Sequence, residues 1–403
     1  MSEINSSNFK TEHGDLAPDL VGVSELTSPY FFVPPSGTTA ERPENCEPGT
    51  IRFNTDHGTL EVFRGKTIGW EQIQRRESQY LGGDSANSVI TTSTNSNRGT
   101  GTRAIILGGR GSSSSNLKDM IDFFTINTLG NAKDFGNLTA AHYSMGVVCD
   151  GTRVVAAGGR TPSFVQDIHF FTISSTGDAA DSGGDLNNTE NPAGLSDSVR
   201  GVFAITSGSA YKNAIDYITI QSIGTAQDFG DLTDIRGYGA ALASTTRGCF
   251  IGGLDTTQPA PDLDIDVIDF VTIRSTGNAT DFGNLNVAVS QPGAASNAVR
   301  GIVCGGSPDN QSTVLNNIQF ITIATTGNAV DFGDLLNVSI GACTVANSTR
   351  FVHHRGRTNS GDGSRVNILE FAEIASTGNT QDFGDLVDDP SDRDGTSNGH
   401  GGL

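Results

Sequence analysis

The chain has 403 residues, of which 51 are glycine, and its formal net charge is −20 at neutral pH. Such an acidic surface repels phosphate backbones, which argues against nucleic-acid binding. No run of residues reaches the ~18 apolar side chains of a membrane helix, so we expect no membrane insertion. The five cysteines form no CxxC pair and no disulfide spacing, which is typical of a protein made in a reducing cytosol.

The region before residue 79 differs from the rest of the chain. Residues 1–48 are polar and in part Pro-rich, and predict an extended docking arm. Residues 49–78 predict a small β module, because 50–73 alternates strand-forming stretches with the turns NTDHG and RGK. A piece this small buries little core by itself. We therefore expect residues 1–75 to attach to other proteins, and a homo-oligomer is left open.

Six copies of one motif follow. The first copy is IDFFTINTLGNAKDFGNL (121–138), and its TGN-type glycine recurs every 47–53 residues. A period near 50 residues indicates a propeller or an array. The aligned glycines are Gly130, Gly177, Gly224, Gly277, Gly327 and Gly378.

Each copy predicts four strands. In the second copy these are a small-residue strand (143–149), a hairpin turn, a second strand (153–159), a third strand of the IDFFTI type and a fourth that carries DFG. The third strand is apolar on both faces, as expected for a sheet packed between two neighbouring sheets.

We therefore predict an all-β fold in which residues 79–388 form a six-bladed β-propeller with four-stranded blades. The first and last copies are in phase, which predicts that no blade is shared between the termini. Residues 389–403 are polar and Gly-rich and predict a flexible tail. A seventh blade remains an alternative if YLGGD (80–84) begins another unit.

The copies resemble kelch repeats, in which a GG doublet closes the second strand and aromatic strands follow. They depart from kelch in having Phe for the usual fourth-strand Trp, Ser182 in the second copy, and HHRG (353–356) instead of the doublet in the last. Such arrays resemble kelch-like virion proteins of tailed bacteriophages, especially cyanophages. The segment GTIRFNTDHGTLEVFRG…GWEQI (49–73) is similar to short β modules of phage tail and fibre proteins.

This resemblance implies a structural protein of the virion, assembled in the host cytoplasm and without enzymatic activity. We expect a tail-fibre or other appendage component that displays a propeller for attachment to the host cell surface. One alternative is a collar, tail or capsid-decorating component without receptor binding. A glycan-active propeller enzyme is a further alternative, although the Asp-box pattern of sialidases is absent and the repeats contain no Trp.

Two sets of residues recur at fixed places in the repeats. Kinase DFG motifs require partner motifs that are missing here, so we predict that this Phe is a packing anchor and this Gly permits a bend. The arginine that opens each second strand is expected to bond the DFG aspartate, or a carbonyl of its own or an adjacent blade. An arginine ring facing an anionic ligand is the alternative. The residues are Arg103, Arg153, Arg200, Arg247, Arg300 and Arg350; Asp134, Asp181, Asp228, Asp281, Asp331 and Asp382; and Phe135, Phe229, Phe282, Phe332 and Phe383.

We predict no catalytic residue, no cofactor and no metal site. The acidic segments 181–185 and 262–266 lack the spacing of a calcium loop. His353 and His354 are adjacent in a strand and therefore face opposite sides, as a packing and a surface residue.

The loops between second and third strands vary most among the copies, and we expect them to gather on one face. They either contact a host glycan or protein or are inert. They comprise residues 110–119, 254–266, 307–316 and 356–365.

Overall fold

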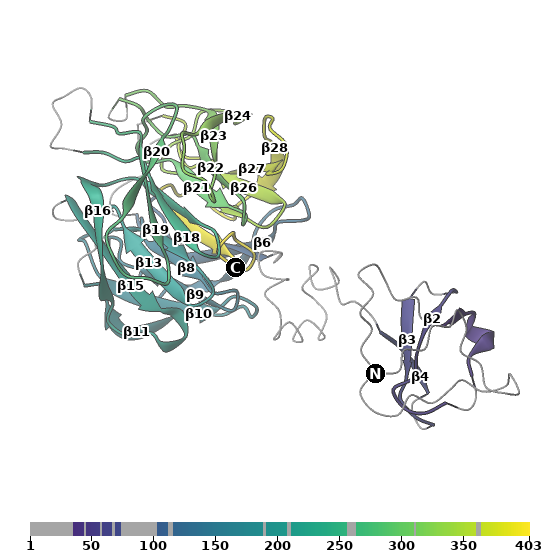
Figure 1. Cartoon of the computed structure of the whole chain (residues 1–403). Coiled ribbons are helices and arrows are strands. Elements are labelled where there is room, and N and C mark those ends of the chain that lie inside the picture. The colour runs from purple at the N-terminus through teal and green to yellow at the C-terminus, as the bar shows by residue number, and fades with distance from the viewer. Residues whose placement is uncertain are drawn as a thin grey trace, which may run out of the picture. The chain divides into compact units, whose positions relative to one another are not determined.

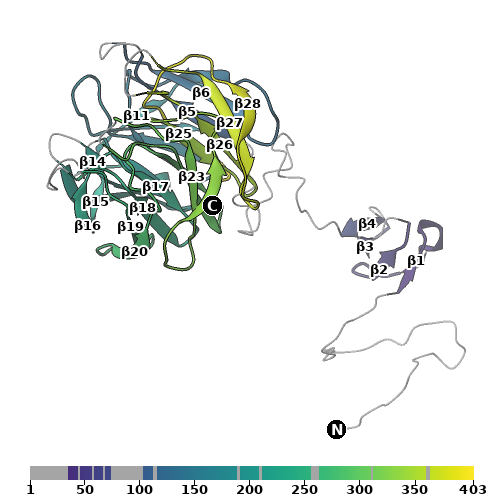
Figure 2. The same ribbon diagram turned by 90° about the horizontal axis from the view of Figure 1, so that it is seen from above.

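A computed structural model describes residues 35–43, 46–56, 59–66, 69–73, 103–111, 116–187, 191–207, 211–255, 263–309, 312–359 and 364–403. The chain divides into two compact units, residues 1–76 and 77–403, drawn in purple and in blue to yellow in Figures 1 and 2. The described residues are almost entirely strands and turns, with the short 3-10 helices η1 (Thr39–Glu41) and η4 (Ile220–Ser222). Within them, no helix has the length and apolar character that a membrane span requires.

The N-terminal unit is a four-stranded sheet in the order β1-β2-β3-β4. Its strands are β1 (Ser36–Gly37), β2 (Ile51–Asn54), β3 (Thr59–Phe63) and β4 (Trp70–Ile73). The last three match the strands expected in 50–73. The first pairs in parallel with β2, so residues 35–43 belong to this sheet and the predicted boundary at residue 48 is too late.

A buried carboxylate explains why the preceding segment joins the module. Glu61 is fully buried in β3 and is bonded by the guanidinium of Arg42 and the amide of Asn54. Arg52 of β2 in turn donates to the carbonyl of Thr38 at 3.0 Å. These bonds supply the polar partners that a buried charge needs, and they tie residues 38–42 to the sheet.

In its described residues the second unit contains six antiparallel sheets, which we number I to VI. Sheet I consists of β29 (Asp394–Ser397), β5 (Arg103–Leu107), β6 (Met120–Thr125) and β7 (Lys133–Asn137). Sheet II consists of β8 (Gly146–Cys149), β9 (Arg153–Ala157), β10 (Asp167–Thr172) and β11 (Ala180–Asp185). Sheet III consists of β12 (Ala193–Ser196), β13 (Arg200–Ala204), β15 (Tyr211–Thr219) and β16 (Gln227–Arg236), with the short β14 (Thr206–Ser207) added to β15.

The other three sheets follow the same order without additions. Sheet IV consists of β17 (Ala240–Ala243), β18 (Arg247–Ile251), β19 (Val267–Thr272) and β20 (Thr280–Asn284). Sheet V consists of β21 (Gly293–Ser296), β22 (Arg300–Cys304), β23 (Asn317–Thr322) and β24 (Val330–Asp334). Sheet VI consists of β25 (Cys343–Ala346), β26 (Arg350–His354), β27 (Ile368–Glu373) and β28 (Gln381–Asp385).

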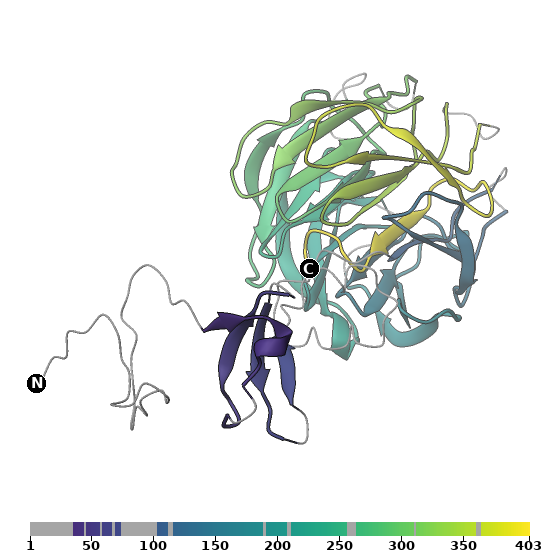
Figure 3. The same ribbon diagram turned by 90° about the vertical axis from the view of Figure 1, so that its right-hand side faces the viewer.

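The first strands of the six sheets contact one another in a circuit. The order is β8, β12, β17, β21, β25, β29 and again β8. Figure 3 shows the sheets following one another from blue through green to yellow around these strands. Hydrophobic clusters fill the spaces between neighbouring sheets; one joins Ile105 and Phe135 of sheet I to Val147 and Phe171 of sheet II. Both faces of the sheets are therefore covered, as the third strands predicted.

The C-terminal residues correct two predictions. The strand β29 pairs antiparallel with β5, so the chain's last strand completes the sheet that its first repeat begins. One sheet is therefore shared between the two ends of the repeat region, and residues 389–403 are not a flexible tail. The segment 80–84, where a seventh blade was considered, lies outside the described residues.

The glycines of this C-terminal segment permit close packing. A Cβ atom on Gly402 would lie 1.7 Å from the carbonyl oxygen of Ser196 in sheet III. Gly401 donates its N–H to the carbonyl of Ser296 in sheet V at 2.8 Å, and Leu403 is buried. His400 contacts the carbonyl of Cys149 in sheet II at 2.7 Å. The segment therefore crosses the ends of the first strands, where it borders a small cavity of about 50 Å³.

Candidate functional site

The six arginines that open the second strands connect each sheet to the next. Each Nη1 donates to the carbonyl oxygen of the isoleucine that follows the next sheet's third strand, at 2.8–3.3 Å. The pairs are Arg103–Ile173, Arg153–Ile220, Arg200–Ile273, Arg247–Ile323, Arg300–Ile374 and Arg350–Ile126. The last pair returns from sheet VI to sheet I, so the series is cyclic.

Each of these guanidinium groups also lies over an aromatic ring of its own third strand, 4.3–5.1 Å from the ring centroid. Such cation–π contacts add to the charge-assisted hydrogen bonds. The arginines were expected to bond the DFG aspartate or a backbone carbonyl. The structure shows that each one bonds a carbonyl of the adjacent sheet. The six DFG aspartates are all exposed. The arginines thus hold sheets together and do not form an open ring toward a ligand.

The Phe and Gly of DFG have separate structural roles. The five phenylalanines are 2–3% exposed and pack between sheets. Gly136 has a φ of 150°, and a Cβ atom there would lie 2.4 Å from the carbonyl oxygen of Gly177 in the next sheet. The glycine of the DFG motif therefore lies against the TGN-type turn of the next sheet, where a larger side chain at the DFG glycine would meet the backbone.

Backbone hydrogen bonds complete this boundary. Gly177 and Ala179 donate their N–H groups to the carbonyls of Phe135 and Asn137, both at 2.8 Å. Asp178 accepts the N–H of Asn137 through Oδ1 at 2.9 Å. The edge of each fourth strand is thus covered by the next sheet's turn, which removes an exposed edge. The corresponding glycine–phenylalanine bonds elsewhere are Gly130–Phe383, Gly277–Phe229, Gly327–Phe282 and Gly378–Phe332.

The residues that differ among the sheets gather at one end of the first strands. Two residues before each first strand, the backbone takes the left-handed conformation, with φ between 52° and 60°. The six residues at this position are Ser144, Asn191, Tyr238, Gln291, Gly341 and Asp392. Five of them are not glycine, and each such residue costs about 1 kcal/mol or more of backbone strain. Non-glycine residues in this conformation are concentrated at functional sites.

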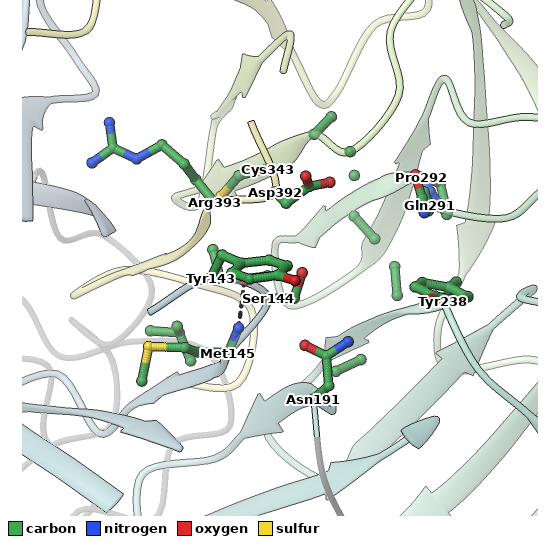
Figure 4. Close-up of a pocket in the computed structure, with 18 of the residues that line it drawn as sticks. Tyr143, Ser144, Met145, Asn191, Tyr238, Gln291, Pro292, Cys343, Asp392 and Arg393 are labelled. Carbon is green, nitrogen blue, oxygen red and sulfur yellow. Dashed lines mark hydrogen bonds between the residues drawn. The ribbon is translucent and has the colours of Figure 1, made fainter. Parts of the chain in front are cut away.

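These six residues line a cavity of about 290 Å³, which we call the mouth. Figure 4 shows Ser144, Asn191, Tyr238, Gln291 and Asp392 surrounding it from different sheets. Head-to-tail backbone bonds connect several of them around its rim: Gln291 to Tyr238, Gly341 to Gln291, Asp392 to Gly341 and Ser144 to Asp392, at 2.6–3.3 Å. The rim is therefore a preorganised set of six different residues, five of which have a side chain.

Four arginines and two aspartates line the mouth, although the chain as a whole is acidic. Arg357 donates to the side chains of Gln291 and Asp392 at 2.9 and 3.3 Å. Arg110 lies 3.4 Å from the other carboxylate oxygen of Asp392. Arg393 is fully buried and pairs with Asp122 at 2.6 Å.

One arginine of the mouth is less constrained. Arg160 stacks on Phe164 and Tyr143, 4.4 and 5.5 Å from their ring centroids. In the part of the chain that the structure describes, its guanidinium has no carboxylate within ion-pair distance. Asp394 also lines the mouth and accepts the N–H of Met145 at 2.8 Å, and burial raises the pKa of its carboxyl well above the ordinary value. The mouth thus offers guanidinium, carboxyl, phenol and amide groups to a small polar ligand.

The other sequence candidates lie elsewhere or outside the description. Asp181 and Asp185 are exposed on β11, whereas residue 262 lies outside the described residues. His353 and His354 are both fully buried, which corrects the expectation that one faces the surface. His353 contacts two hydroxyl groups and His354 the carbonyl of Val366, so both act in packing.

Sequence reasoning missed the mouth because its residues have no common chemistry. Their position in the repeats could have identified them. They occupy the same place in all six copies, but each copy has a different amino acid there. The variable loops named above are described only in part. No protein-family model matches this chain, and no curated protein matches it.

Proposed function

We propose that the second unit is a six-bladed kelch-like β-propeller, closed by β29, that serves as a structural and host-attachment component of a phage virion. The cyclic arginine–isoleucine bonds and the circuit of first strands support the closed ring. The resemblance of the repeats and of residues 49–73 to phage virion proteins supports the setting. In this proposal residues 1–75 attach to other virion proteins after assembly in the host cytoplasm.

The observation that carries host attachment is the contrast between the boundaries and the mouth. The repeated Arg, Phe and Gly residues are used in contacts between sheets, whereas the mouth presents six different residues on a strained and hydrogen-bonded rim. A cavity of about 290 Å³ accommodates a group of the size of one sugar residue. Its hydroxyl or carboxyl groups would find donors in Arg160 and Gln291 and acceptors in Asp394. The ligand we propose is a host surface glycan or a polar protein segment, and the proposal includes no catalysis and no cofactor.

A purely structural collar, tail or capsid-decorating role is the second candidate. This role is favoured by the ion pairs within the mouth, because Arg357 and Arg110 both pair with Asp392. In that case the arginines stabilise the first strands, and the mouth has no ligand.

Competition for adsorption separates the two candidates. The purified full-length chain is added to host cells before the phage, and the adsorption rate is measured. The attachment role predicts slower adsorption with the unmodified chain, a reduced effect with Arg160→Ala, and an unchanged effect with the control Lys133→Ala, which removes the same charge from the exposed strand β7. Normal adsorption at saturating protein would support the purely structural role.

A further inference from the structure

We propose that His142, His169 and Asp167 form a binding site for a divalent transition metal, with Zn²⁺ as the ion that fits their chemistry best. His142 lies in the connection from β7 of sheet I to β8 of sheet II, and the other two residues lie on β10 of sheet II. One ligand atom of each residue lies within 4.8 Å of the others. Imidazole nitrogens together with a carboxylate oxygen are a common ligand set for zinc.

The hydrogen bonds of the two imidazoles leave the metal-binding nitrogen available. The Nδ1 atom of His142 lies 2.8 Å from the carbonyl oxygen of Ala140, which can only accept, so Nδ1 carries the proton. The Nδ1 atom of His169 lies 2.7 Å from the hydroxyl of Thr139, which accepts a hydrogen bond when Nδ1 carries the proton. In that tautomer of His169, both Nε2 atoms hold a lone pair. A second-shell oxygen that fixes the tautomer in this manner is typical of zinc-bound histidine.

These lone pairs have no hydrogen-bond partner in the part of the chain that the structure describes. His142 and His169 are 0% and 2% exposed, and among the described residues no group hydrogen bonds to either Nε2. The ring centroids are 4.8 Å apart with an edge-to-face orientation. Burial also lowers the pKa of both rings, in the case of His169 to about 4, so both are in the neutral form that binds a metal near pH 7.

A comparison with the equivalent positions of sheet IV shows that the two histidines lack a partner of opposite charge. Arg236 and Asp269 occupy the places of His142 and His169, and they form a buried ion pair at 3.0 Å. There, each polar group satisfies the other. In sheet II, two neutral imidazoles face each other, and neither lone pair can satisfy the other. A buried acceptor requires a donor or a cation, and a metal ion satisfies both at once.

The residue at the position of His169 has a structural role in other sheets that does not call for histidine. In sheets III to VI its oxygen accepts an N–H group of the preceding sheet at 2.6–3.1 Å. These acceptors are Asp216, Asp269, Gln319 and Glu370. Sheet II alone replaces this oxygen with a ring that has a second, unused nitrogen.

The third ligand opens the site to solvent. Asp167 is exposed, so an ion can enter from its side. Its carboxylate would offset part of the charge of the ion that the neutral imidazoles leave uncompensated. Two histidines and one carboxylate leave the fourth tetrahedral position of zinc for water.

Zinc titration of the full-length chain tests the proposal, with a chromophoric chelator as competitor and Co²⁺ absorption as a second readout. We expect the unmodified chain to bind one more equivalent of Zn²⁺ than the double variant H142Q/H169Q. Asp167→Asn should weaken that site at least about tenfold, and it can be used even if the double variant fails to fold, because the side chain is exposed. The control His400→Gln, whose Nε2 already contacts a carbonyl, should leave zinc binding unchanged.

Two results would overturn the proposal. One is equal zinc affinity and stoichiometry for the unmodified chain and for both the Asp167 and the double variant. The other is a crystal structure grown with Zn²⁺ in which a water molecule alone lies between the two Nε2 atoms.

Discussion

Arg350 of sheet VI donates a hydrogen bond to the carbonyl oxygen of Ile126 in sheet I, at 3.2 Å. The same guanidinium lies 4.3 Å from the ring centroid of Phe371 and pairs with Glu373 at 2.8 Å. This bond joins the last repeat to the first in the same way as the other five arginines join their sheets. Sheet VI is therefore connected to sheet I by a side chain of the same kind as the one that connects the other neighbouring sheets.

Replacing this arginine tests the ties between sheets. Arg350→Ala removes a charge-assisted hydrogen bond and a cation–π contact, and we expect the free energy of unfolding to fall by about 1.5–3 kcal/mol. Urea unfolding measures the change. Lys133→Ala is the control, because Lys133 is exposed on β7, and a surface substitution usually changes stability by about 0.5 kcal/mol or less. Equal losses in the two variants would contradict the assigned role.

Shortening the chain tests the closing strand. A chain that ends at Asp389 lacks β29, which leaves the edge of β5 and the core beside it uncovered. We expect this chain to aggregate or to lose cooperative unfolding, whereas a chain that lacks only residues 399–403 keeps β29 and unfolds cooperatively at a lower temperature. Size-exclusion chromatography and thermal melting distinguish the two. A melting temperature unchanged by the longer deletion would show that β29 is dispensable.

Three glycine variants separate close packing from backbone strain. Gly136→Ala meets both a positive φ and a carbonyl at 2.4 Å, and should cost more than about 2 kcal/mol. Gly130→Ala has a similar φ but open space around its Cβ, so about 1–2 kcal/mol is expected. Gly224→Ala has neither constraint and should be neutral or slightly stabilising. Denaturant midpoints measure the stability of the three variants. A larger loss for Gly130→Ala than for Gly136→Ala would contradict the proposed effect of the close contact at Gly136.

Two buried histidines should make the fold sensitive to acid. Burial lowers the pKa of His353 and of His354 from 6.5 to about 3. Between these values the unfolded chain binds protons that the folded chain does not, so stability falls as the pH drops from about 6.5 toward 3. Each histidine contributes a slope of up to roughly 1.4 kcal/mol per pH unit. Above about pH 7 both states are neutral, and this contribution is constant.

Urea midpoints between pH 7 and pH 5 measure this slope before most carboxylates titrate. His354→Gln retains a side chain that can donate to the carbonyl of Val366 but cannot titrate. We expect the free energy of unfolding of this variant to depend less steeply on pH, by up to roughly 1.4 kcal/mol per pH unit, which corresponds to one proton. An identical slope in both proteins would mean that His354 is protonated in the folded state.

Much of the fold was predictable because the repeats carry their own alignment. The period, the hairpin turn at Asp150-Gly151 and the two-sided apolar character of the third strand indicated six similar sheets. The pairing of β29 with β5 was not predictable in the same way. Its sequence, Asp394–Ser397, contains no apolar residue, although Thr396 and Ser397 are buried where the first strands contact one another. Glycine in residues 399–402 indicated mobility by composition, whereas in the structure it permits close contact with neighbouring carbonyls.

The candidate site was harder to predict for a physical reason. The recurring arginines attracted attention because they are charged and regular, and regularity is what contacts between equivalent sheets produce. The mouth depends on a left-handed backbone at residues such as Tyr238 and Gln291, which carry no local signal for that conformation. The histidine cluster joins His142, in the connection between sheets I and II, to two residues of β10, and no local pattern in the sequence indicates this contact.

We propose that this chain is an external component of a phage particle. Cryo-electron microscopy of the particle tests that proposal most directly. We predict density for a closed ring of six four-stranded sheets on the outside of the particle, with residues 1–75 against other virion proteins and the mouth accessible from solvent. Absence of the chain from purified particles, or a ring whose mouth is covered by other virion proteins, would contradict the account.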